Sequence, residues 1–219
     1  MHAVILLGVV FSLPCRYQLI HLGFHNLSAI NSSRTLYSLS RCCRYIIKPE
    51  RVVKSITTYA HLPQSSVLNL LDNKHLLHLS ESGTYRHVTD THSIPGYHRV
   101  SNLTTQPAAT TGDQELSHLV RPMFLDPYFM PLMSANVNET ADAYVVTAQH
   151  DVVRDDGLLY AARLMNSTNV KVKLEHYKDG FHSFFHFSEG PLQLKSAQSA
   201  LKNLINYLRH SVVQKHRDW

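Results

Sequence analysis

Residues 144–182 read YVVTAQHDVVRDDGLLYAARLMNSTNVKVKLEHYKDGFH, and this stretch decides the fold. It opens on a β-branched, aromatic run of the kind that forms a buried strand. Asp151 follows this run, and a helical stretch begins near Leu158. Residues 170–174 then alternate apolar and polar residues, as a strand does, before the chain reaches His182. The order of strand, acid, helix, strand and histidine predicts an α/β sheet.

Asp151 and His182 each stand just past the end of a predicted strand, where open α/β sheets build their sites. An imidazole can accept and return a proton near neutral pH, and a carboxylate can hold it in one tautomer. The alternatives are a helix-capping or loop carboxylate for Asp151 and one surface histidine of sixteen for His182. Asp155 and Asp156 rival Asp151 as the acid, but they suit the first turn of a helix better.

Size and composition predict one globular domain. The chain has 219 residues, of which 44% are hydrophobic, enough for a sizeable core. The net charge of +5 is spread out, the densest basic groups being Arg41 with Arg44 and the tail 215–217. No basic stripe interleaved with aromatics indicates a nucleic-acid partner. The chain has three cysteines, Cys15, Cys42 and Cys43, and their spacing is not that of a zinc site. We expect buried free thiols, and a disulfide from Cys15 to either of the other two is the alternative.

Five glycosylation sequons favour the secretory pathway; they begin at Asn26, Asn31, Asn102, Asn138 and Asn166. The apolar run 3–13 is a poor targeting signal, because only Met1 and His2 precede it and neither is a lysine or arginine. That run is also far shorter than the roughly 20 apolar residues of a membrane span.

Periodicity predicts the other elements. We expect strands over 3–12, 143–148 and 170–176, and helices over 35–47, from Pro49, over 65–72, over 155–166 and over about 192–210. Residues 80–113 are rich in Ser, Thr, His, Gly and Pro, and we expect a long surface loop there. The three prolines of 121–133 predict a second irregular connection.

The acid-bearing stretch 144–161 resembles that of arylacetamide deacetylases and neutral cholesterol ester hydrolases, in the hormone-sensitive-lipase branch of the α/β-hydrolases. Asp179-Gly180-Phe181-His182 resembles their histidine turn, and 124–133 resembles the segment before their acid strand. The resemblance is strong over about 120–210. It implies a partial α/β-hydrolase fold, the C-terminal half of a mostly parallel sheet, in one domain over 1–219. Cap or lid elements and connections would occupy 20–120, and the acid- and histidine-bearing part 121–219.

By resemblance, the activity is hydrolysis of apolar carboxylic esters or amides by a Ser-Asp-His triad, with Asp151 and His182 as catalytic residues and no cofactor or metal. The family's His-Gly-Gly segment and Gly-x-Ser-x-Gly elbow do not occur in this sequence, and Ser183 stands where the family usually has glycine. We therefore expect the C-terminal part of a serine esterase whose serine is missing from this chain. The alternative is an inactive remnant that binds a ligand or partner. The resemblance and the sequons together indicate the luminal side of the endoplasmic reticulum, with membrane association only in a parent protein.

Two histidine pairs, one aspartate and a group of phenylalanines are also candidate site residues. The pairs His75–His78 and His182–His186 have metal-like spacing, but no carboxylate or thiol completes a ligand set. Asp126 either supports the acid strand or forms a turn before Pro127. Four phenylalanines near the histidine favour core packing over a substrate wall; they are Phe181, Phe184, Phe185 and Phe187.

Overall fold

The computed structural model describes residues 2–6, 17–19, 49–72, 74–79, 81–88, 90, 93–94, 96, 112–151 and 153–217. The strands are β1 (His2–Leu6), β2 (Tyr17–Leu19), β3 (Asp142–His150) and β4 (Val172–Phe181). The longer helices are α3 (Pro49–Tyr59), α6 (Gln114–Phe124), α7 (Arg154–Met165) and α8 (Lys195–Arg217). Shorter helices are α4 (Ser66–Leu71) and α5 (Gly83–Val88), with 3₁₀ turns at Lys74–Leu76, Pro131–Met133 and Phe184–Phe187.

The described strands form one parallel sheet in the order β2-β1-β3-β4. β3 lies between β1 and β4 and buries six consecutive residues, 143–148. Both faces of β3 are therefore covered, which explains its nearly continuous apolar sequence. Helix α7 connects β3 to β4, as a parallel crossover requires. The predicted α/β class is confirmed.

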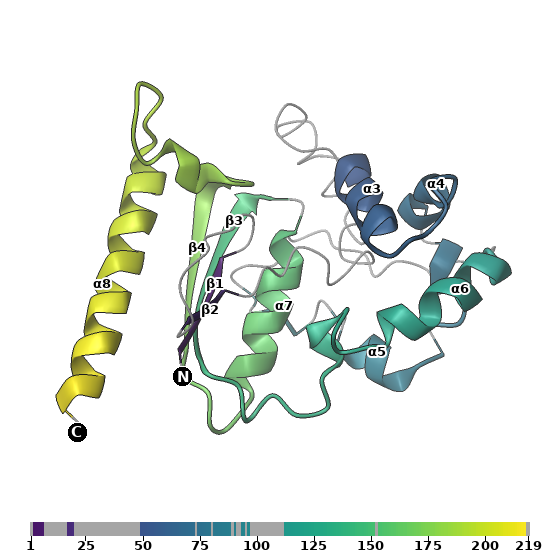
Figure 1. Ribbon diagram of the computed structural model, residues 1–219, viewed down its shortest axis with the longest axis horizontal. Coiled ribbons are helices and arrows are strands. Elements are labelled where there is room, and N and C mark those ends of the chain that lie inside the picture. The colour runs from purple at the N-terminus through teal and green to yellow at the C-terminus, as the bar shows by residue number, and fades with distance from the viewer. Residues whose placement is uncertain are drawn as a thin grey trace.

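The side chains of β3 alternate between two cores, one on each face of the sheet. Ala143 and Val145 belong to a core that includes α7 and the helices α3 to α6. Tyr144, Val146 and Ala148 belong to a second core, which packs against Ala197, Ala200 and Leu204 of α8. Figure 1 shows the same arrangement, with α8 on one side of the sheet and the other helices on the opposite side. Period-two alternation in β3 thus assigns each helix to a face.

Two predicted irregular segments contain helices. Helix α5 lies inside the segment 80–113, for which a long loop was predicted, and that prediction is wrong for residues 83–88. Helix α6 continues through Pro122 to Phe124, so the predicted irregular connection over 121–133 begins later than expected. Pro122 lies in the last turn of α6, so the lost hydrogen bond and the carbonyl clash that a helical proline causes fall near the end of the helix and not in its middle. Asp113 caps the helix by accepting a bond from the Leu116 amide at 2.9 Å.

The remaining predicted elements differ from the structure mainly at their ends. Helix α3 begins at Pro49 as predicted, and α8 runs to Arg217, beyond the predicted end near His210. The predicted helix over 35–47, the later part of the strand predicted over 3–12 and all three cysteines lie outside the described residues. Among the helices that the structure describes, none is both long and apolar enough to cross a membrane.

Candidate functional site

Asp151 is the first residue after β3, and its carboxylate is held by the turn that leads into α7. Its Oδ1 atom accepts a hydrogen bond from the Val153 amide at 3.0 Å, and its carbonyl oxygen accepts one from the Arg154 amide at 3.2 Å. This local turn is the kind that aspartate favours, because the side chain can bond the backbone two residues ahead. Only 2% of the Asp151 side chain is exposed. The carboxylate is therefore fixed at the carboxyl end of the sheet.

His182 follows β4 directly, beyond an irregularity in the strand pairing. Ala148 pairs with Tyr177, and His150 pairs with Phe181. Between these two pairs, β4 advances by four residues while β3 advances by two. A β-bulge of this kind redirects the side chains that follow it. Gly180 lies in the bulge, where an added Cβ atom would stand 3.0 Å from the Ala148 Cβ atom. Close packing of the bulge against β3 thus requires glycine.

The two side chains meet. His182 Nδ1 lies 3.0 Å from Asp151 Oδ1. A carboxylate can only accept, so Nδ1 carries the proton and Nε2, on the other side of the ring, is the proton acceptor. Burial is the largest influence on the pKa of His182 and lowers it. The hydrogen bond to Asp151 and the attraction of its negative charge raise the pKa, and together they prevail, so the pKa lies above its ordinary value.

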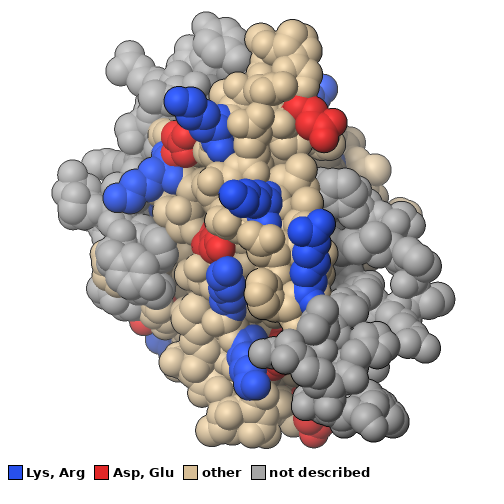
Figure 2. Space-filling view, turned by 90° about the vertical axis from the view of Figure 1, so that its left-hand side faces the viewer, with Lys and Arg blue, Asp and Glu red and all other residues tan. Residues whose placement is uncertain are grey.

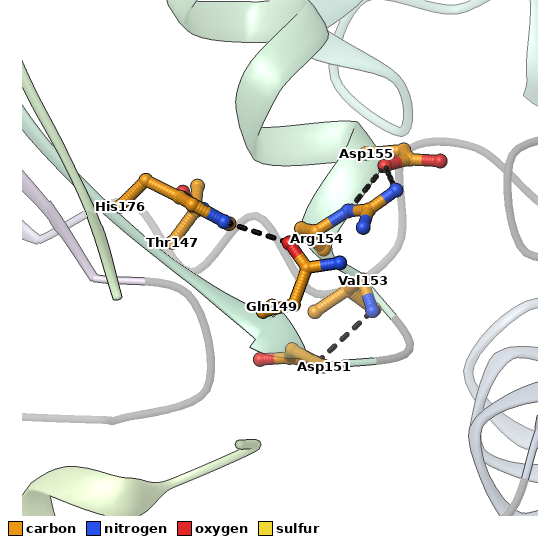
Figure 3. Close-up of polar contacts among 7 residues, drawn as sticks. All are labelled: Thr147, Gln149, Asp151, Val153, Arg154, Asp155 and His176. Atoms are coloured by element: carbon orange, nitrogen blue, oxygen red, sulfur yellow. Dashed lines mark hydrogen bonds and ion pairs between the residues drawn. The ribbon is translucent and has the colours of Figure 1, made fainter. Parts of the chain in front are cut away.

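The rival acids have other contacts. Asp155 is bonded by Arg154, whose Nε and Nη2 atoms both lie 2.7 Å from Asp155 Oδ1. Figure 3 shows that Arg154 pairs with Asp155, while Asp151 takes the Val153 amide. Asp155 and Asp156 are buried in the first turn of α7, consistent with the predicted favourable interaction with the helix dipole. Of the three acids, the structure brings Asp151 to His182.

Sequence reasoning missed a polar group beside this pair. His176 of β4 contacts Thr147 and Gln149 of β3, with nitrogen-to-oxygen distances of 2.8 and 2.9 Å. The only available signal was that Thr147 and Gln149 share a strand face. The pairing of Thr147 with His176 depends on the register between two strands, which the residue pattern does not specify.

The other candidate residues have structural surroundings. Asp126 Oδ1 accepts the Tyr128 amide at 2.9 Å, which is the predicted turn around Pro127. His75 is fully buried beside Phe124, with 5.6 Å between ring centroids. Within the described ranges, no three His, Cys, Asp or Glu side chains converge as metal ligands would.

The phenylalanines after the bulge pack as core residues. Phe184 and Phe185 are buried in the core beneath α8, and Phe181 and Phe187 pack against the same core at its margin. The prediction of core packing is confirmed for this cluster. The cluster anchors the turn that begins immediately after His182.

Comparison with known proteins supports the α/β-hydrolase class that the sequence predicts. Residues 83–186 match a family described as an alpha/beta hydrolase fold. The chain is 34% identical over 101 residues to neutral cholesterol ester hydrolase 1 of Bos taurus, covering 45% of this chain and 24% of that protein. It is 37% identical over 101 residues to the arylacetamide deacetylase of Mus musculus, covering 45% and 25%. It is 28% identical over 153 residues to arylacetamide deacetylase-like 2 of Homo sapiens, covering 69% and 33%.

A solved esterase from Pyrobaculum calidifontis aligns with a TM-score of 0.37 and 24% identity, covering 49% of this chain and 36% of that one. The matched stretches span about a quarter to a third of the length of the curated relatives. The parallel sheet with flanking helices and the family match define part of an α/β-hydrolase fold. Within that fold, the chain is similar over part of its length to arylacetamide deacetylases and a neutral cholesterol ester hydrolase, which confirms the predicted resemblance.

Proposed function

We propose that this chain provides the acid and the base of a serine ester hydrolase, with Asp151 as the acid and His182 as the base. The contact of 3.0 Å between His182 Nδ1 and Asp151 Oδ1 is the observation that carries the proposal. The two residues follow adjacent parallel strands, and open α/β sheets bind ligands at that edge. Their order along the chain also agrees with the Ser, acid, His order of α/β-hydrolases.

In this proposal the nucleophile is a serine that is missing from this chain, whose sequence contains no Gly-x-Ser-x-Gly motif. His182 Nε2 takes the proton from the serine hydroxyl as the oxygen attacks the ester carbonyl, and later gives the proton to the leaving group. Asp151 keeps the proton of the neutral imidazole on Nδ1 and stabilises the imidazolium that forms. The raised pKa of His182 is consistent with an imidazolium stabilised by a neighbouring carboxylate.

The names of the relatives support the substrate class. One group is named for cholesterol esters and the other for arylacetamides. We propose apolar carboxylic esters, and amides of similar shape, as the substrates of this site. We also propose that residues 20–120 hold cap or lid elements. The helices α3, α4 and α5 support this, because they lie away from the strands yet share the core on the α7 face.

The test supplies the missing nucleophile. A segment of mouse arylacetamide deacetylase that carries its His-Gly-Gly and Gly-x-Ser-x-Gly motifs is joined ahead of this chain, and hydrolysis of p-nitrophenyl butyrate is measured. We expect activity that falls by about 10⁴-fold in Asp151→Asn, because the imidazole loses its fixed tautomer. His182→Ala is expected to lose at least as much. Asp126→Asn is the matched control, because that carboxylate is exposed and makes a local contact with the Tyr128 amide.

The outcomes separate the two functions. Activity that disappears in both site variants and survives in the control supports the proposal. A folded chimera whose activity is indifferent to His182 would refute it. The alternative, an inactive remnant that binds a ligand or partner, would then be the better account.

Glycosylation offers a test of the proposed compartment, the lumen of the endoplasmic reticulum. Asn138 and Asn166 begin two of the sequons and are both exposed, as acceptor sites must be. The sequons are adjacent in space, since Ser167 Oγ donates to Asn138 Oδ1 at 2.7 Å. We expect a mobility shift on deglycosylation of the protein expressed in animal cells, and a smaller shift for Asn138→Gln. A protein that carries no glycan would argue against the lumen.

A further inference from the structure

The imidazole of His176, on β4, bridges two residues of the neighbouring strand β3 on the α7 face of the sheet. Thr147 and Gln149 follow Val145 at two-residue steps along β3, and His176 lies opposite Thr147 on β4. His176 Nε2 lies 2.9 Å from Gln149 Oε1, and His176 Nδ1 lies 2.8 Å from Thr147 Oγ1. Because an amide oxygen only accepts, Nε2 carries the proton and the Thr147 hydroxyl donates to Nδ1. Figure 3 shows the ring reaching along β3 towards Gln149.

This bridge is costly to place on a buried sheet face. Ala143 and Val145 on the same face belong to the apolar core, and Thr147 is only 2% exposed. A threonine hydroxyl in such a place costs about 1–3 kcal/mol if it lacks a partner. An apolar pair would fill this space with no such cost. The polar bridge therefore needs an explanation beyond core packing.

The position of the bridge along the sheet provides that explanation. Regular pairing of β3 with β4 ends at Ala148 and Tyr177, one residue beyond Thr147 and His176. The two-residue excess of the bulge follows, and the Asp151–His182 contact lies on its far side. Backbone pairing is interrupted between these two side-chain contacts. The geometry of the acid and base thus depends on how the strands are held at the base of the bulge.

We propose that His176 is a positioning residue: by bridging Thr147 and Gln149, it fixes β4 against β3 at the base of the bulge so that His182 meets Asp151. The inference rests on the proposed roles of Asp151 and His182, and it adds a residue that acts on both without touching substrate. Hydrogen bonds from two directions hold the ring at one height along β3. An apolar contact has no preferred direction and would hold the ring less firmly against β3.

The test uses the whole chain and reads the acid–base contact directly. In NMR spectra, the hydrogen-bonded Nδ1 proton of His182 gives a downfield signal, and the ring carbons give the pKa. Thr147→Val removes the hydroxyl and keeps the shape, whereas Thr147→Ser keeps the hydroxyl. We expect the downfield signal to be lost, and the pKa of His182 to fall towards its ordinary value, in Thr147→Val and not in Thr147→Ser. Gln149→Met, which removes the other partner, is expected to act like Thr147→Val.

Glu175→Gln is the control for a general loss of stability. Glu175 lies next to His176 on β4, and its carboxylate has other partners. Its Oε2 atom accepts from the Tyr177 hydroxyl at 2.6 Å and from Asn203 Nδ2 at 3.1 Å, and its Oε1 atom lies 3.2 Å from Lys173 Nζ. This substitution disturbs β4 while sparing the bridge, so the His182 signal should persist. Each variant is checked by its melting curve.

Three results would contradict the positioning role of His176. If folded Thr147→Val keeps the signal and the pKa of wild type, the bridge is structural only and the inference is wrong. If Glu175→Gln loses the signal as readily, the effect is not specific and the inference is again wrong. If the wild-type chain shows neither the signal nor a fall in pKa on Asp151→Asn, the acid–base pair itself fails, and the proposed function falls together with the inference.

Discussion

Replacing Ser183 by glycine should give a more stable protein than replacing it by alanine, because this residue has a left-handed backbone conformation. Its φ and ψ are 64° and 22°, directly after His182, in the turn that leads to Phe184. A residue with a Cβ atom is strained there by about 1–2 kcal/mol. Glycine removes that strain but costs about 0.5–1 kcal/mol of extra freedom in the unfolded chain. The net gain is about 0.5–1 kcal/mol.

Ser183→Ala is the comparison that isolates the backbone. Both substitutions remove the hydroxyl and whatever it contributes, and only glycine relieves the strain. For a chain of this length, that difference corresponds to a melting temperature higher by about 1–4 °C in Ser183→Gly than in Ser183→Ala. Thermal melts and urea unfolding of the two variants provide the measurement. Equal stability of the two, or a less stable glycine variant, would refute the reasoning.

The same variants bear on the site. The left-handed turn directs the chain from His182 to the buried Phe184 and Phe185. Glycine adopts this conformation without strain, so we expect the pKa of His182 to be the same in Ser183→Gly as in wild type. The family resemblance places a glycine here, and the structure now explains that preference by backbone geometry.

Three further predictions concern charge and packing. Asp151→Asn should lower the pKa of His182 in an NMR titration, because the charge that stabilises the imidazolium is lost; an unchanged pKa would contradict the contact. Gly180→Ala should destabilise the protein by about 1 kcal/mol in urea unfolding, because its Cβ would crowd Ala148, whereas Gly83→Ala, with open space around it, should not. Burial lowers the pKa of His75 from 6.5 to about 3. The unfolded chain therefore takes up the proton first, and the contribution of His75, present above pH 6.5, should decrease by about 2 kcal/mol between pH 7 and pH 5. His75→Leu should remove that part of the pH dependence, and a variant with the wild-type pH dependence would exclude His75 as its source.

Sequence patterns located the sheet because the signals of β3 and β4 are strong. The β-branched run of 144–148 lies within β3, and the alternation of 170–174 overlaps the first three residues of β4. Helix α6 was obscured by Pro122, although Leu116, Val120 and Phe124 repeat every four residues and are all buried. Helix α5 has only two buried residues, Tyr85 and Val88, too few to give a period. A short helix held by its neighbours cannot be read from its own residues.

The site was predictable to the extent that it depends on chain order. Asp151 and His182 follow neighbouring strands, and the strand-end rule with the family resemblance selected them. The bulge was not predictable, because Lys178-Asp179-Gly180 indicates a turn, whereas the structure keeps these residues within β4. Pairing between strands decides between those outcomes, and that pairing involves residues about 30 positions apart.

The acid–base pair depends on contacts made within one continuous part of the chain. Val153 fixes the Asp151 carboxylate, the bulge directs His182, and Phe184 and Phe185 anchor the following turn against α8. All of these groups lie between β3 and α8, and none of these contacts requires a nucleophile. The pair should therefore form its hydrogen bond whether or not a serine is supplied. Measuring the Nδ1 proton of His182 in the unmodified chain tests that independence, and its absence in a folded protein would count against the acid–base pair and the function proposed for it.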